Sequence, residues 1–85
     1  MMLRVLFFAG VKERLGCAGR EVQWQQSAAN LDDLQAQLCA DGGPLWVEVL
    51  GQANMIRAVN QTVVEGNCAL QDGDEIAFFP PVTGG

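Results

Sequence analysis

The carboxylate at the C-terminus is the group of this sequence at which we expect chemistry. The chain ends in Gly84 and Gly85, so this carboxylate sits on a backbone without side chains. Glycine has no Cβ, which lets a backbone pass through a channel too narrow for any other residue. Pro80 and Pro81 lack an N–H group, so they end strand pairing and direct the following residues away from a sheet. We expect Gly85 to carry the chemistry and Gly84 to thread it into another protein.

Other catalytic groups are scarce in this chain. It has no His, so the usual base and metal ligand at neutral pH is missing, and Ser27 and the cysteines have no imidazole to activate them. Asp32 and Asp33 are adjacent at a predicted helix start and face different directions, which fits capping better than acid–base chemistry. We expect no enzymatic activity from the chain alone, no bound cofactor and no metal site.

The cysteines and the first apolar run indicate a compartment. Cys17, Cys39 and Cys68 are odd in number, widely spaced and form no Cys-x-x-Cys pair, so neither a disulfide framework nor a zinc site fits. We expect three buried small hydrophobes in a reducing environment. Lys12 and the charges after it interrupt the first apolar run too early for a signal peptide. We therefore expect a cytoplasmic protein.

Charge indicates the kind of partner. The net charge of the 85 residues is −5, and no Lys or Arg follows Arg57, so the last third of the chain is acidic. Such a surface repels nucleic acid and anionic membranes, and it favours a protein partner with a basic docking site. We expect no nucleic acid and no membrane partner.

The periodicity of the apolar residues predicts an α+β domain. Alternation predicts a first strand at 3–8 and a second at 21–25, and leucines on one stripe predict the main helix over 31–38, stopped at 42–44. A helical turn is expected at 11–15, and 45–50 fits a short helix better than the alternative strand. Strands are predicted at 56–59 and 62–64 around a turn at 60–61, and a last strand at 74–79.

This order predicts a β-grasp (ubiquitin-like) fold, in which a mixed sheet wraps around one main helix and the last strand lies beside the first. Another small α+β sandwich remains the alternative. Residues 1–81 would form the domain and residues 82–85 a flexible tail.

The strand period also assigns faces. If Leu3, Val5 and Phe7 point into the core, Phe8 points outward, and Phe79 does the same on the last strand. Two exposed rings near the departing tail would form a docking surface. The alternative is a second small cluster covered by a loop.

Three segments carry a family resemblance. They are Val5-Leu6-Phe7-Phe8-Ala9, Ala58-Val59-Asn60-Gln61-Thr62 and, above all, the ending Leu70-Gln71-Asp72-Gly73-Asp74-Glu75-Ile76-Ala77-Phe78-Phe79-Pro80-Pro81-Val82-Thr83-Gly84-Gly85. The sequence resembles the small subunits of molybdopterin synthase, a family of ubiquitin-like sulfur carriers. A terminal Gly-Gly alone would also fit other ubiquitin-like proteins, whereas the acidic turn and the proline-containing ending favour this family. Residues 16–55 contribute little to the resemblance.

The resemblance implies a mechanism. An ATP-dependent enzyme of the ubiquitin-activating type would convert Gly85 to a glycyl adenylate, and a sulfur donor would replace AMP to give a thiocarboxylate (1-thioglycine). Inside the large subunit, within a heterotetramer, this group would donate sulfur to cyclic pyranopterin monophosphate and build the dithiolene of molybdopterin. The implied partner-binding residues are Phe8, Phe79, Pro80, Pro81, Val82 and Thr83.

Two alternatives stay open at this point. A ubiquitin-like modifier, or a sulfur carrier for thiamine or tRNA, would use the same tail with a different acceptor. A β-grasp binding module would need no reactive tail at all.

Overall fold

The computed structural model describes residues 2–24, 29–52 and 54–80. Five strands form the main sheet: β2 (Gly19–Gln23), β1 (Met2–Phe7), β7 (Glu75–Phe79), β4 (Ile56–Val59) and β5 (Thr62–Val64), in that spatial order. A small second sheet pairs β3 (Ala29–Asn30) with β6 (Ala69–Leu70). The helices are α1 (Ala9–Leu15), α2 (Leu31–Gly42) and α3 (Pro44–Leu50).

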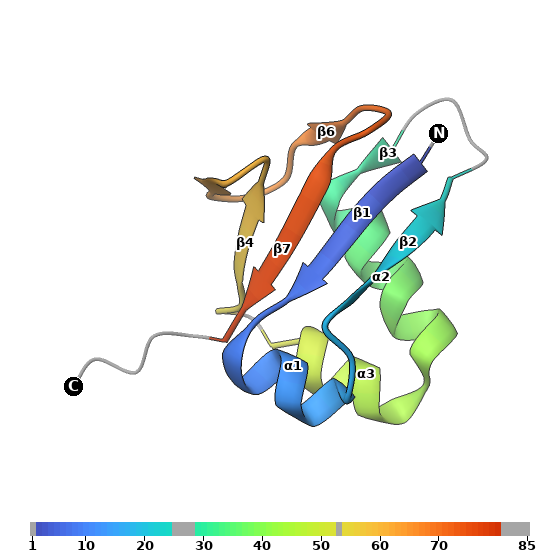
Figure 1. Ribbon diagram of the computed structural model, residues 1–85, viewed down its shortest axis with the longest axis vertical. Helices are drawn as coiled ribbons and strands as arrows, with labels where there is room; N and C mark the ends of the chain where they lie inside the picture. The colour runs from blue at the N-terminus through green and yellow to red at the C-terminus, as the bar shows by residue number, and fades with distance from the viewer. Residues whose placement is uncertain (1, 25–28, 53, 81–85) are drawn as a thin grey trace.

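The last strand lies beside the first, as the sequence predicts. β1 and β7 run parallel at the centre of the sheet, with Val5 opposite Ile76 and Phe7 opposite Phe78. The other pairs of the main sheet are antiparallel. α2 crosses one face of this sheet, while α1 and α3 pack at one end (Figure 1). The α+β class and the β-grasp arrangement around one main helix are therefore confirmed.

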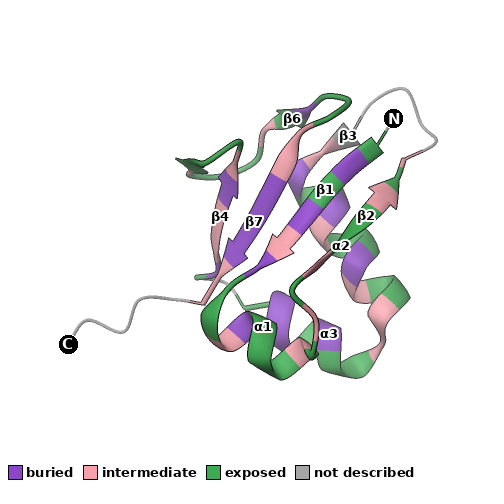
Figure 2. Cartoon of the chain, in the orientation of Figure 1, coloured by how far each residue is buried: buried purple, intermediate pink, exposed green. Residues whose placement is uncertain are grey.

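A single apolar core lies between the sheet and α2. The residues predicted to point inward, Leu3, Val5, Phe7, Ile76 and Phe78, are all exposed by 1% or less. From α2, the core takes the buried leucines at positions 31, 34 and 38, which recur at helical spacing. The buried segments follow the central strands and the inner side of α2 (Figure 2). The inward faces of the strands and of α2 thus pack against each other in one core.

Side chains and a carbonyl satisfy the free N–H groups at the start of α2. The Asn30 side chain accepts a hydrogen bond from the Asp33 backbone N–H at 2.8 Å, and its amide donates to the Asp33 carboxylate at 2.8 Å. The N–H of Asp32 donates to Asn67 at 2.9 Å, and that of Leu31 to the Cys68 carbonyl at 2.9 Å. The capping side chain is therefore that of Asn30 and not, as predicted, those of Asp32 and Asp33. The Asp33 carboxylate holds the Asn30 amide, and the Asp32 carboxylate pairs with Arg57.

Several element ends differ from the prediction by one to four residues, and the starts of α1 and β2 have clear local reasons. α1 begins at Ala9 rather than at residue 11, because the Phe8 carbonyl accepts from the N–H groups of Val11 and Lys12. β2 begins at Gly19, opposite Leu6, where a Cβ would lie 2.4 Å from the Val5 carbonyl oxygen and only glycine fits. The small β3–β6 sheet was not predicted, since two residues a strand show no period.

The segment 45–50, ambiguous from its pattern, is helix α3 with Pro44 at the first position, where its missing N–H costs nothing. No helix within the described residues is long and apolar enough to span a membrane. The predicted boundary between domain and tail, after residue 81, lies outside the described residues.

Candidate functional site

The described chain ends at the predicted root of the tail. β7 finishes at Phe79, and Pro80 is half-buried next to it. The predicted site residues Pro81, Val82, Thr83, Gly84 and Gly85 lie outside the described residues, so their roles stay predictions.

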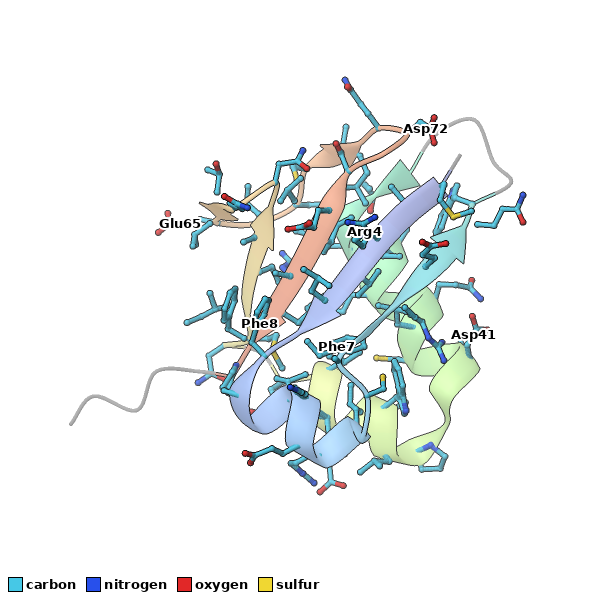
Figure 3. All side chains as sticks on the ribbon, in the orientation of Figure 1. Arg4, Phe7, Phe8, Asp41, Glu65 and Asp72 are labelled. Atoms are coloured by element: carbon cyan, nitrogen blue, oxygen red, sulfur yellow. The ribbon has the colours of Figure 1, made fainter. Side chains whose placement is uncertain are left out.

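The structure brings Phe8 and Phe79 together. Their rings stack with centroids 4.8 Å apart and planes at 8°. The N–H of Phe8 donates to the Phe78 carbonyl at 3.2 Å, which extends the parallel pairing beyond the end of β1. Phe8 stays 40% exposed and its side chain lies on the outer side of the sheet (Figure 3). The outward position of the pair is confirmed, but only Phe8 is exposed as predicted, whereas Phe79 is half-buried. A cluster covered by a loop does not fit the exposure of Phe8.

Apolar neighbours on the same face enlarge this pair. In the register of the sheet, Phe79 lies opposite Ile56, and Ala77 lies opposite both Ala58 and Leu6. We call this set the apolar face; its members are Leu6, Phe8, Ile56, Ala58, Ala77 and Phe79. The two alanines are buried and form a flat floor, while no described helix covers the face (Figure 1). An uncovered apolar sheet surface beside the tail root suits a protein interface.

Sequence reasoning missed part of this face. Ile56 and Ala58 belong to it because β4 pairs with β7, which places them opposite Phe79 and Ala77. The hairpin turn at Asn60 and Gln61, both with positive φ, connects β4 to β5. The turn was predicted, so alternation along 56–59 was the signal that could have placed both residues outward.

The other end of the same face is charged. Arg4 on β1 lies between Glu21 on β2 and Glu75 on β7 in the sheet register. Asp72 and Asp74 follow in the turn before β7, where they accept hydrogen bonds from the Met2 and Gln71 N–H groups. Carboxylates outnumber the one guanidinium there. We call Glu21, Asp72, Asp74 and Glu75 the acidic rim. It begins about four strand residues, ~13 Å, from Phe8, so the acidic surface expected from the sequence lies at the far end of the face and not beside the rings.

The cysteines are half-buried, whereas the sequence analysis predicted that they would be buried. Cys17, Cys39 and Cys68 are free, and each packs against the core. Burial raises the pKa of the Cys39 thiol, whose sulfur lies 3.7 Å from the Trp46 carbonyl oxygen. Residues of the described part bring no three His, Cys, Asp or Glu side chains together as metal ligands. The thiols therefore behave as packing groups.

Known proteins share the sequence and the fold. The model of the ThiS family matches residues 5–85. The molybdopterin synthase sulfur carrier subunit of Escherichia coli (strain K12) is 44% identical over 86 residues, 99% of this chain and 100% of that protein. The corresponding subunit of Haemophilus influenzae is 40% identical, again over 99% of this chain and 100% of that protein.

A solved structure is similar as well. It is a protein–protein complex of subunits 1 and 2 of the molybdopterin-converting factor from Helicobacter pylori 26695. The matched chain aligns with a TM-score of 0.68 and 32% identity over the full length of both chains. Both the Gly-Gly ending and the strands of the sheet thus fall within the matched regions.

Proposed function

The chain belongs to the ThiS family and, within it, to the sulfur carrier subunits of molybdopterin synthase, and from this premise we propose that its Gly85 carboxylate carries sulfur as a thiocarboxylate. The sulfur is delivered to cyclic pyranopterin monophosphate, where it forms the dithiolene of molybdopterin. The observation that carries the proposal is the exposed stack of Phe8 on Phe79 at the root of a Gly-Gly ending.

Loading requires an activated carboxylate, because a free carboxylate is a poor electrophile. An ATP-dependent enzyme of the ubiquitin-activating type lets a Gly85 carboxylate oxygen attack the α-phosphate of ATP, which releases pyrophosphate and leaves a glycyl adenylate. A donor that delivers sulfur at the oxidation level of sulfide then attacks the carbonyl carbon. A C–S bond forms, the C–O bond to AMP breaks, and AMP leaves.

Delivery belongs to the large subunit. The chain has no His, and no Lys or Arg follows Arg57, so the cationic groups that the transfer needs come from the partner. Four residues follow Pro81 and span at most ~13 Å, enough to place the thiocarboxylate in a narrow pocket. After transfer and hydrolysis the carboxylate returns for another cycle.

Docking uses the apolar face with the acidic rim at its far end. Phe8 and Phe79 contact the large subunit, Pro80 and Pro81 direct the tail, and Val82 to Gly84 line the entry. The complex of the two Helicobacter pylori subunits supports such a pairing. We propose a heterotetramer of two copies of each subunit, with the activating enzyme using the free carrier. The free thiols support a cytoplasmic location.

Deletion of Gly85 tests the proposal in a reconstituted sulfur-transfer assay. It retracts the terminal carboxylate by roughly 3.3 Å, and a misplacement of ~1 Å can already cost a hundred-fold in rate. We expect no transfer, with an unchanged melting temperature and an affinity for the large subunit within about three-fold of wild type. Full transfer by the deletion variant would overturn the proposal, since the chain holds no second cargo site.

A further inference from the structure

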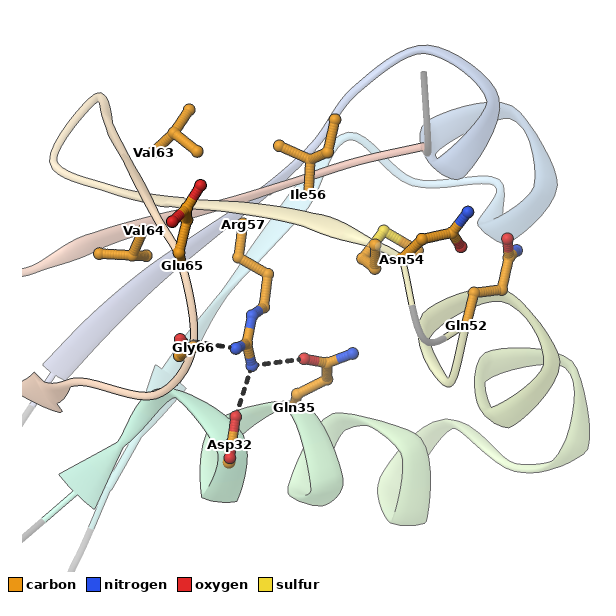
Figure 4. Close-up of a pocket in the computed structure, with 11 residues that line it drawn as sticks. Asp32, Gln35, Gln52, Asn54, Ile56, Arg57, Val63, Val64, Glu65 and Gly66 are labelled. Carbon is orange, nitrogen blue, oxygen red and sulfur yellow. Dashed lines mark hydrogen bonds and ion pairs between the residues drawn. The ribbon is translucent and has the colours of Figure 1, made fainter. Parts of the chain in front are cut away.

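A cavity of about 540 Å³ lies between the β4–β5 hairpin and the first turns of α2. Met55 and Val64 supply its apolar part, whereas Asp32, Gln52 and Glu65 line it with polar groups. Figure 4 shows the Arg57 side chain reaching from β4 toward α2 along one wall. The cavity therefore combines an apolar surface with carboxylates.

Both terminal guanidinium nitrogens of Arg57 donate hydrogen bonds within this wall. One of its guanidinium nitrogens donates to Asp32 at 2.6 Å and to the Gln35 side chain at 3.0 Å, and the other donates to the Gly66 carbonyl at 2.7 Å. The Arg57 side chain is only 14% exposed. Its charge is balanced by Asp32, so it is not available to an anionic ligand.

Glu65 leaves the cavity with a net negative charge. It is exposed and forms no ion pair with any residue of the described chain. The Arg57 and Asp32 charges cancel, and Arg57 is the one cation among the lining residues. A cationic group placed here would gain Coulomb attraction without displacing an existing partner.

β5 next to the cavity is an edge strand of three residues, and this short length is one of the features that limit pairing at an open edge. It is the last strand in the order of the sheet, so one side of its backbone has no neighbouring strand in the described structure. It holds no charge and no proline, and Val63 is 62% exposed. By contrast, the opposite edge strand, β2, carries Arg20 and Glu21. Natural edge strands normally carry such charges because an open edge pairs with other chains.

We propose that β5 and the adjacent cavity bind an extended basic segment of another protein. The segment adds a strand to β5, covers Val63 and places a Lys or Arg side chain beside Glu65 and Asp32. Main-chain hydrogen bonds supply the affinity and the cavity supplies the preference for a cation, as in other cases of strand addition. The register places Val63 opposite Ala58, so this surface borders the apolar face. Its carboxylates, Asp32 and Glu65, are not members of that face, and binding of a basic segment there goes beyond the proposed function.

A second copy of this chain does not fit as the occupant. Its residues 81–85 contain no Lys or Arg and end in a carboxylate. Its cations, Arg4, Lys12, Arg14, Arg20 and Arg57, all stand in regular strands or helices that are already part of the fold. The complementary segment must therefore come from a different protein.

NMR titration of the full-length chain tests the proposal. The probe is the capped peptide acetyl-Thr-Val-Arg-Val-Thr-amide, and its matched control carries Glu in place of Arg. We expect amide shift changes at 62–66 and 32–35, with a Kd of roughly 1 mM that weakens as salt screens the charges. Glu65→Gln should weaken binding roughly three-fold, and Glu13→Gln on α1 should leave it unchanged.

Three results would overturn the proposal. They are equal binding of the two peptides, shifts centred on Phe8 and Phe79, and no shifts at about ten times the expected Kd. None of these results bears on sulfur transfer. Sulfur transfer by the same preparation, measured in parallel, reports separately on the proposed function.

Discussion

At the scale of single residues, the ring stack at the tail root separates docking from folding. Phe8 lies outside the buried cluster, and its ring meets only Phe79 among the aromatic side chains described. Its removal should therefore affect a partner more than the interior. The neighbouring Phe7, one position earlier, is 1% exposed and stacks within the core.

Phe8→Ala and Phe79→Ala should each weaken binding to the large subunit by about 2 kcal/mol, roughly thirty-fold in affinity, because interface aromatics near the centre of a patch act as anchors. Isothermal titration calorimetry measures the affinity, and urea unfolding measures the stability. Leu45→Ala is the matched control: Leu45 is 43% exposed but lies on α3, and its loss should leave the affinity unchanged. Reduced stability with unchanged affinity would instead make the rings part of the core.

The thiols offer a second test at this scale. Burial raises the pKa of Cys39, so the protonated thiol, which is the poor nucleophile, predominates at neutral pH. Alkylation of Cys39 at pH 7 should be slower than that of free cysteine and should speed up as pH rises toward the raised pKa. Mass spectrometry of the labelled peptides follows the reaction.

The triple variant Cys17→Ser, Cys39→Ser and Cys68→Ser should keep sulfur transfer once any loss of stability is corrected for. If one of these substitutions alone abolishes transfer in a folded chain, a persulfide relay replaces the C-terminal mechanism.

At the scale of elements, Arg57 joins parts of the fold that are far apart in sequence. It sits on β4 and bonds α2 through Asp32 and Gln35 and the β5–β6 connection through Gly66. Sequence alone did not reveal this role, because the partners lie 22 and 25 residues away and the residue shows no periodic signal. The predicted elements themselves were recognisable, because each of their apolar residues repeats with the period of its own strand or helix.

Arg57→Met should therefore lower the free energy of unfolding by about 2 kcal/mol, since hydrogen bonds from a charged, mostly buried donor are lost. Arg14→Met is the control: Arg14 pairs with Glu48 at 3.3 Å on an exposed surface, where such pairs contribute about 0–1 kcal/mol. Urea unfolding of both variants gives the comparison. Equal losses of unfolding free energy in the two variants would show that the Arg57 contacts stabilise the fold no more than an exposed ion pair does.

Element ends were less predictable than element types for a related reason. β2 starts where Gly19 must pass the Val5 carbonyl, and α1 starts where the Phe8 carbonyl finds its donors. Both are contacts with other segments, which periodicity does not encode. The outward pair Phe8 and Phe79 was predictable because period two fixes a face, whereas the cavity beside β5 depends on where α2 crosses the sheet.

At the scale of the whole molecule, the β-grasp fold places its helices on one side and at one end of the sheet, which leaves the apolar face open next to Pro80 (Figure 1). The acidic rim stands at the far end of that face. A partner with an apolar patch beside a narrow pocket and a basic rim would match both features and receive the tail. The fold thus supports delivery of a group that the chain alone does not use.

The central claim is that sulfur is carried on Gly85, and mass spectrometry of the loaded protein tests it most directly. The chain is incubated with ATP, an activating enzyme and a sulfur donor, then digested without reducing agents. We predict that the C-terminal peptide gains the mass difference between sulfur and oxygen, that the gain requires ATP, and that a Gly85 deletion removes it. A sulfur adduct on Cys17, Cys39 or Cys68 with an unmodified C-terminal peptide would contradict the account.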